Sequence, residues 1–174
     1  MSPAACMTVI NTSPVVHLHL ALPGGIAALP GLIGEVIVPH EVLLELAAGG
    51  PKDDAWQAVQ RAAGIVCRHT PCQLHPLLAA QIDSGEAAVI QTALDENVGT
   101  VILDDRKARR IAATLGIAVT GTLGILVQAK AAGMLPSLRE SVALLQSRGI
   151  WLDVAIVSQA LALADEMEPP SSRG

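Results

Sequence analysis

Short runs of aliphatic and β-branched residues alternate with longer segments of helical periodicity along this chain. Runs that predict strands lie at residues 7–10, 34–39, 65–69, 99–105 and 117–122, and the run at 65–69 is the weakest. Apolar residues recur at helical spacing at 40–50, 53–64, 83–97, 106–116, 123–133, 135–149 and 151–167. Strands that alternate with helices predict a doubly wound, parallel α/β sheet with right-handed crossovers.

Individual residues refine this pattern at the ends of the segments. After the first strand, Ser13 or Thr12 is expected to cap a helix whose first turn contains Pro14, where the missing N–H costs nothing. No repeat or low-complexity linker divides the chain, so we expect a single domain at 1–166. The residues at 167–174 are expected to form a disordered tail.

The composition indicates the kind of core and the compartment. The 174 residues are 51% hydrophobic but only 1% aromatic, without Phe or Tyr, so the core has to consist of Ala, Val, Ile and Leu. Trp56 and Trp151 are expected to be core or interface anchors. Three cysteines suggest no disulfide framework, and no apolar run reaches the roughly 18 residues of a membrane span. We expect a cytoplasmic protein that does not bind membranes.

Polar residues that follow strands are the first candidates for function, because ligands bind at the carboxyl ends of the strands in open parallel sheets. Asn11 follows the first strand, and the neighbours Asp104 and Asp105 follow the fourth. A helix cap explains one aspartate there, but two adjacent carboxylates repel each other, so a bound cation explains the pair better. We expect Asp105 to point into the site, with Asp104 as the cap or support.

Two further carboxylates have competing interpretations. Asp83 and Glu86 resemble a capping box, yet Glu86 also continues the buried stripe of its helix, where a carboxylate needs a partner such as a cation. Both interpretations of Glu86 stay open. Glu45 lies four residues after Glu41 on a polar strip, so a solvated face is the default, and nothing local favours one over the other.

The charge distribution bears on nucleic-acid binding. A net charge of −5 argues against indiscriminate binding, although four of the eleven basic residues lie within 106–110. A solvated helix face is the simpler explanation for at least two of them. Thr120 and Thr122 suit a phosphate at a helix start, or a plain tight turn. Potential zinc ligands lie in one loop at Cys67, His69, Cys72 and His75, but their spacing matches no standard zinc arrangement.

Taken together, several segments resemble one known family over about residues 8–160. They are VINTSPVVHL, GEVIVPHEVLLEL, DSGEAAVIQTAL, VILDDRKARRIAATLGIAVTGTLGILVQAKAAGML and LLQSRGIWLD. The chain resembles PIN-domain proteins, in particular a prokaryotic subgroup of predicted nucleic-acid-binding proteins related to the toxin ribonucleases of toxin–antitoxin modules. The resemblance implies a three-layer fold, with a parallel sheet of four or five strands between helices.

The resemblance also implies an acidic cluster that holds Mg²⁺ or Mn²⁺ and hydrolyses RNA phosphodiesters. Its first acid falls on Asn11, its helix acid on Glu45 rather than Glu41, and its remaining acids on Glu86 and Asp105. The implied metal ligands are Asn11, Glu86 and Asp105, and the implied catalytic residues are Glu45, Glu86, Asp104 and Asp105. Nucleic-acid contacts are expected from Ser13, Arg106, Lys107, Arg110, Thr120 and Thr122. RNA, a cognate antitoxin and a second copy in a homodimer are the expected partners.

Asn11 departs from the family pattern and leaves three functions open. An asparagine coordinates through its carbonyl oxygen but brings no charge, and one carboxylate near a divalent ion is worth several kcal/mol at an effective dielectric of about 20. The chain is therefore expected to be a metal-dependent ribonuclease with a weakened site, or an inactive PIN domain that binds RNA or protein. A phosphate- or nucleotide-binding domain that uses residues 120–124 is the third option, against which the lack of a Gly-rich loop after the first strand counts. Alternatively, Asn11 is a turn former tied to Ser13 and Thr12.

Overall fold

The chain folds around a single sheet of five parallel strands. The structure is a computed structural model and describes residues 7–49 and 54–167. The strands are β1 (Met7–Ile10), β2 (Glu35–Val38), β3 (Ile65–Cys67), β4 (Thr100–Ile102) and β5 (Ala118–Thr120). Their order is β3-β2-β1-β4-β5, and each neighbouring pair is parallel. The predicted α/β class with four or five parallel strands is confirmed.

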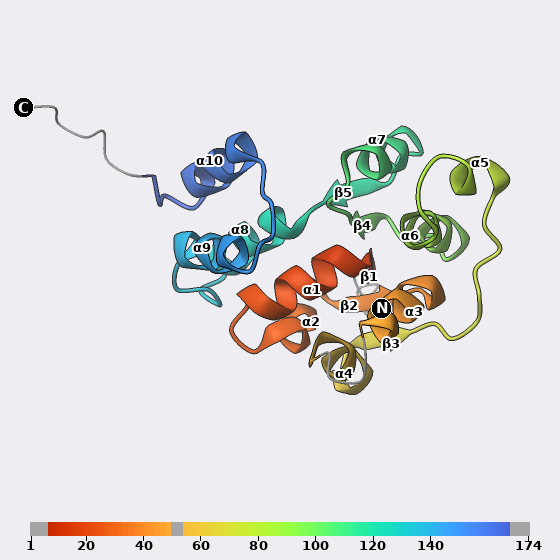
Figure 1. The fold of residues 1–174 in the computed structure, drawn as a ribbon, viewed down its shortest axis with the longest axis horizontal. Coiled ribbons are helices and arrows are strands. Elements are labelled where there is room, and N and C mark those ends of the chain that lie inside the picture. The colour runs from red at the N-terminus through yellow and green to blue at the C-terminus, as the bar shows by residue number, and fades with distance from the viewer. Residues whose placement is uncertain (1–6, 50–53, 168–174) are drawn as a thin grey trace, which may run out of the picture.

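Helices cover the sheet and extend beyond one of its ends. They are α1 (Thr12–Ala21), η1 (Gly25–Ala28), α2 (Leu29–Ile33), α3 (His40–Ala48), α4 (Asp54–Arg61), α5 (Pro76–Ala79), α6 (Ser84–Asp95), α7 (Arg106–Thr114), α8 (Thr122–Ala131), α9 (Leu138–Ser147) and α10 (Val154–Leu163). Figure 1 shows α6 and α7 on one side of the strands and α1, α2 and α8–α10 on the other. Helix α6 packs on β1 and β4, and α8 packs against both α1 and α10.

The observed boundaries differ from the predicted ones in a few places. Asn11, not Ser13 or Thr12, occupies the N-cap position of α1, because its backbone is extended and the helix begins at the next residue. The short helices η1, α2 and α5 were not predicted, since each has five residues or fewer and is too short to show a helical period. The predicted tail lies outside the described residues except for Met167.

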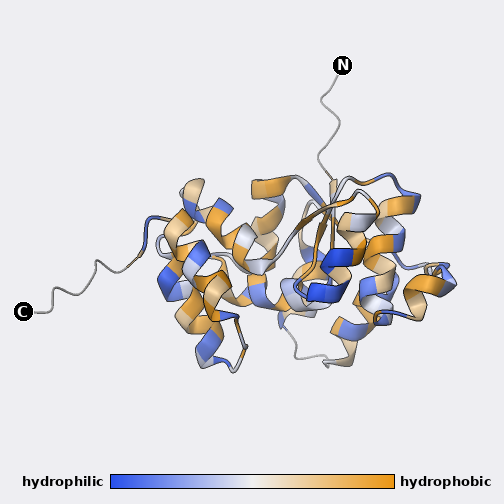
Figure 2. Cartoon of the chain, turned by 90° about the horizontal axis from the view of Figure 1, so that it is seen from above, coloured by the Kyte–Doolittle hydropathy of each residue, from blue (hydrophilic) through white to orange (hydrophobic). Residues whose placement is uncertain are grey.

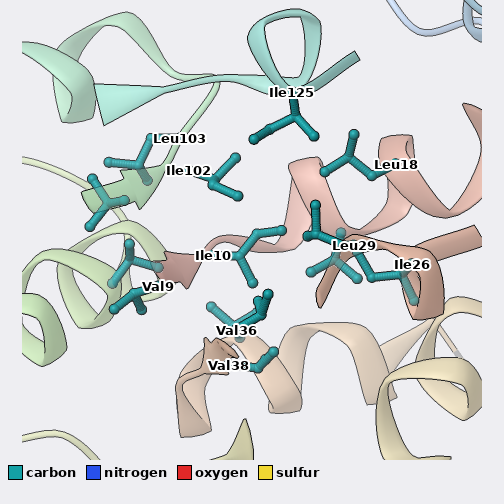
Figure 3. Close-up of a cluster of buried hydrophobic side chains, with 14 of the residues drawn as sticks. Val9, Ile10, Leu18, Ile26, Leu29, Val36, Val38, Ile102, Leu103 and Ile125 are labelled. Carbon is teal, nitrogen blue, oxygen red and sulfur yellow. The ribbon is translucent and has the colours of Figure 1, made fainter. Parts of the chain in front are cut away.

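The core is aliphatic, as the composition predicts. The strand residues Val36 and Val38, for example, are fully buried, and both pack into the cluster that Figure 3 shows with side chains from β1, β4 and α8. In Figure 2 the strands are coloured as hydrophobic, whereas the surrounding helices combine both kinds of residue. A sheet buried on both faces explains why its strands are continuous apolar runs without alternation.

Among the described helices, one bent pair but no single helix has the length and composition of a membrane span. No single one has the length and apolar composition of a membrane span. Only α1 taken together with the η1–α2 segment, which is bent by 92° against it, reaches that length and composition.

The strand order reverses at the centre of the sheet. The chain leaves β1 in one direction towards β2 and returns on the other side as β4, so the order reverses between β1 and β4. Ligands of doubly wound sheets bind at such a point, outside the carboxyl ends of the strands. The backbone N–H of Asn11 donates to the carbonyl of Ile102 at 3.2 Å, so the residues after β1 and after β4 start side by side.

Candidate active site at the carboxyl edge of the sheet

Asn11 presents an unused oxygen at the centre of this edge. The residue is 6% exposed, and its backbone carbonyl accepts from the N–H of Val15 at 3.2 Å. Its side chain makes no capping hydrogen bond, and within the described part of the chain its buried Oδ1 has no partner. A turn-forming asparagine would use this oxygen for local hydrogen bonds, so the turn interpretation is wrong. A buried amide oxygen without a partner costs stability unless a ligand or water completes it.

Glu45 reaches this edge from α3, although it lies on a polar strip. Its carboxylate accepts a hydrogen bond from the Thr12 hydroxyl at the start of α1. It also lies against the first turn of α6, where a β-carbon on Gly85 would be 2.5 Å from Glu45 Oε1. Glu41 turns elsewhere, because its Oε1 accepts from the N–H of Cys72 at 2.8 Å. The contacts of Glu45 with α1 and α6 thus favour Glu45 over Glu41 as the residue at this edge. The sequence of α3 alone did not distinguish the two.

Glu86 lies in the capped first turn of α6 and also on its buried stripe. Asp83 Oδ1 accepts from the N–H of Glu86 at 2.8 Å, so Asp83 caps α6 as the capping-box pattern suggests. Glu86 itself is 8% exposed on the buried stripe. Burial, together with the negative charges of Asp83, Asp105 and Glu45, raises the pKa of Glu86 to about 7. The carboxyl is therefore half protonated near neutral pH and is the titrating group of this edge.

The raised pKa of Glu86 makes stability depend on pH. The folded state holds the proton up to about pH 7, whereas the unfolded chain releases it near 4.5, so stability is lost as pH rises through this window. Glu86→Gln is expected to match wild type at pH 4.5 and to exceed its free energy of unfolding by up to ~3 kcal/mol at pH 8. Urea denaturation at pH 4.5, 6 and 8 measures the difference. An equal difference at all three values would show that Glu86 is not buried as described.

Asp105 is the cap of α7, contrary to the expectation that Asp104 plays this role. Its Oδ1 accepts from the N–H groups of Lys107 and Ala108 at 2.8 and 2.9 Å. Its Oδ2 accepts no hydrogen bond from any residue that the structure describes. Its charge contributes to the raised pKa of Glu86, so the two carboxyls lie close enough to interact electrostatically. Asp105 therefore caps α7 through one oxygen and leaves the other without a partner among the described residues.

Asp104 points away from this cluster into a separate polar network. Its Oδ1 accepts from the N–H of Thr122 at 2.8 Å, and its Oδ2 accepts from the Thr122 hydroxyl at 2.7 Å and lies 3.1 Å from Nδ1 of His17. Burial alone would raise the pKa of Asp104, but the hydrogen bonds from His17 and Thr122 hold it below its usual value. Asp104 thus joins β4 to α1 and to the start of α8. It supports the site but is not part of the acidic cluster.

The residues predicted to contact nucleic acid differ in their exposure and in their hydrogen-bond partners. Thr122 is 1% exposed and gives both of its donors to Asp104, so the expectation that it binds phosphate is wrong. Lys107 extends its ammonium to the carbonyl of Gln81. Ser13, Arg106 and Arg110 are exposed, and Thr120 is half-buried at the end of β5.

Arg109 was not predicted, and the structure places it beside the site. Its Nη1 donates to the carbonyl of Leu103 at 2.9 Å. Arg109 lies three residues after Arg106 on α7, and this spacing is the only signal in the sequence that the two arginines face the same side.

The donors at this edge fit a divalent cation by type. Among residues 7–49 and 54–167, no three His, Cys, Asp or Glu side chains converge as a complete ligand set. Mg²⁺, however, needs only one or two carboxylates besides water, and it prefers oxygen. The unpartnered Oδ1 of Asn11, the carboxyl of Glu86 and the free oxygen of Asp105 supply such donors.

The cysteine- and histidine-containing loop forms no comparable site. Cys67 Sγ lies 3.7 Å from Nε2 of Gln60, and Cys72 Sγ lies 3.9 Å from the Thr92 hydroxyl. His75 uses its ring nitrogen to cap α5. Cys67, Cys72 and His75 therefore each make a local contact.

Comparison with known proteins agrees with this fold. A family model described as a PIN domain matches residues 7–166. The chain belongs to the PIN-domain family, which confirms the resemblance. Proteins of this family are generally nucleases and typically use a divalent metal. No curated protein sequence matches the chain.

Proposed function

We propose that this PIN domain is an Mg²⁺- or Mn²⁺-dependent endoribonuclease whose cation site is weakened by Asn11. The observation that supports this most is the pair formed by the unpartnered Oδ1 of Asn11 and the buried carboxyl of Glu86. Both are polar groups whose burial costs stability and which a cation would complete. The charges of Asp105 and Glu45, which raise the pKa of Glu86, would contribute to the same site.

Each residue has a distinct task in this proposal. Asn11, Glu86 and Asp105 would hold the ion, which when bound would neutralise charge on the scissile phosphate and acidify a water. Glu86 gives up its proton to become a charged ligand. Glu45, fixed by the Thr12 hydroxyl, is placed to accept a proton from the attacking water.

RNA cleavage by matched variants tests the proposal. Glu86→Gln and Asp105→Asn are each expected to lower the rate of single-stranded RNA cleavage in Mn²⁺ by at least ~100-fold, because each removes a ligand charge. Asparagine is a good cap residue, so Asp105→Asn should keep α7 intact. Glu41→Gln, on the same helix as Glu45, is the control and should cleave at the wild-type rate. Absence of cleavage by wild type, or equal rates in all variants, would refute the nuclease.

An inactive PIN domain that binds RNA or protein is the alternative. It is favoured by the internal hydrogen bonds that already occupy Glu45 and one oxygen of Asp105. Calorimetric titration with Mn²⁺ separates the two functions. The nuclease requires saturable binding at millimolar metal or below that Asp105→Asn abolishes, whereas the binding module requires none.

The proposal extends to a toxin of a toxin–antitoxin pair that acts as a homodimer on cytoplasmic RNA. Supporting it, α10 carries exposed apolar residues, and Val154 and Leu163 are 76% and 68% exposed. Such residues are typical of protein contacts. Val154→Asp is expected to convert a dimer to a monomer in light scattering, and a wild-type monomer would rule the dimer out. Growth arrest on expression, relieved by a neighbouring gene product, would support the toxin role.

A further inference from the structure

A cavity lies beside the β4–α7 turn, next to the acidic cluster formed by Asn11, Glu45, Glu86 and Asp105. It has a volume of about 500 Å³, within the range of small-molecule sites. The start of α7, the turn between β5 and α8, and helix α10 form its walls. Asp104 lines this cavity while its neighbour Asp105 faces the acidic cluster, so the cavity begins one residue away from the proposed cleavage site.

Charged side chains of both signs line the cavity: Asp104, Asp153 and the α7 arginines Arg106 and Arg109. Both carboxylates already accept hydrogen bonds within the protein, Asp104 from Thr122 and Asp153 from the N–H of Ala155 at 2.9 Å. Arg106 makes no hydrogen bond or ion pair with any described residue, so its guanidinium is available to an anionic ligand.

Gly121 leaves room for the guanidinium of Arg109 at the charged end of the cavity. A β-carbon on Gly121 would lie 2.6 Å from Arg109 Nη1 and 2.9 Å from Asp104 Oδ1. Only glycine at this position therefore lets the guanidinium and the carboxylate lie against the turn. The turn therefore accommodates the guanidinium of Arg109 at the cavity wall.

The opposite end is apolar and carries an exposed aromatic ring. Trp151 lines the cavity and is 81% exposed, so of the two expected positions, core or interface, the core is wrong. Leu152 and Ile156 extend the apolar wall, and Gln159 adds an amide that both donates and accepts hydrogen bonds. An exposed indole beside such a wall is a stacking surface for a planar ring.

These two ends match the two parts of a nucleotide. We propose that the cavity binds one nucleotide of the single-stranded RNA substrate, with its base stacked on Trp151 and its phosphate paired with Arg106 and Arg109. An RNA strand that continues past Asp105 reaches the cavity at the adjoining residue. The inference rests on the proposed function, because it names the substrate subsite beside the cleavage site.

Tryptophan fluorescence tests this directly, because the chain has only two tryptophans and no tyrosine. In Trp56→Phe, Trp151 is the only emitter, and hexa-adenylate RNA added in EDTA is expected to quench it saturably. Adenosine, which lacks the phosphate, should bind about 10-fold more weakly. Trp151→Leu in the presence of Trp56 is the complement and should abolish the quenching, which keeps the test valid if Trp56→Phe does not fold.

The arginine is tested by a charge-matched pair. Arg106→Gln is expected to weaken RNA binding about 10-fold and to lower the salt slope of log K by about 0.7, as for one phosphate contact on a single strand. Arg61→Gln, on α4, removes the same charge elsewhere and should change neither.

Three results would overturn the subsite: no quenching at millimolar RNA, equal loss of affinity in both arginine variants, or quenching by free AMP but not by RNA. Because the titration contains no metal, quenching without cleavage refutes only the nuclease. Cleavage without quenching refutes only the subsite.

Discussion

Asn11→Asp is expected to tighten Mn²⁺ binding by about 100-fold and to raise the RNA cleavage rate at low metal. The substitution keeps the shape of the side chain and puts a charge at the position of the unpartnered Oδ1. Two unit charges at 4 Å attract by about 4 kcal/mol at an effective dielectric of 20, and repulsion from Glu86 and Asp105 cancels part of this gain. A net ~3 kcal/mol corresponds to the expected 100-fold change. Calorimetry gives the affinity.

In the metal-free protein, Asn11→Asp is expected to lower the stability. A buried carboxylate at position 11, close to the carboxyl of Glu86 and the charge of Asp105, costs stability without a cation, so Asn11→Asp should melt below wild type in EDTA and above it in Mn²⁺. Asn11→Ala is the control, because it removes the oxygen without adding charge and should weaken Mn²⁺ binding. Equal affinities for all three proteins would place the ion away from Asn11.

The second large effect concerns stability. Asp104→Ala is expected to lower the free energy of unfolding by about 3 kcal/mol, because it leaves the N–H and the buried hydroxyl of Thr122 unsatisfied and releases His17. For a chain of this length the melting temperature should fall by roughly 6–12 °C. Thermal melts followed by circular dichroism measure the change.

A conservative variant shows that charge and hydrogen bonding both contribute. Asp104→Asn keeps one acceptor and should lose about half as much stability. Since the pKa of Asp104 is lowered on folding, its contribution is present above the usual aspartate pKa and is lost as pH falls through the folded value. The gap between wild type and Asp104→Asn should therefore shrink below about pH 4. A loss under ~1 kcal/mol for Asp104→Ala would contradict this network.

The sequence predicts the sheet, the main helices and the edge where the site lies, because hydrophobic periodicity and strand–helix alternation are local signals. Asn11, Glu86 and Asp105 follow from strand ends and from one buried stripe. The sequence does not predict that Asp105 caps α7 while Asp104 binds Thr122. These roles depend on the side to which each successive aspartate points and on Thr122, which is distant in the sequence. The preference for Glu45 over Glu41 likewise depends on residues of other helices. Side-chain partners from distant elements are thus the part that local patterns do not contain.

We propose that Asn11, Glu86 and Asp105 hold one divalent cation at the carboxyl edge of the sheet. Anomalous diffraction from crystals soaked in Mn²⁺ locates this ion independently of activity. We expect one peak in contact with Asn11 Oδ1 and the carboxyls of Glu86 and Asp105. No peak at this edge at millimolar Mn²⁺, or a peak bound only by other residues, would refute the proposed cation site.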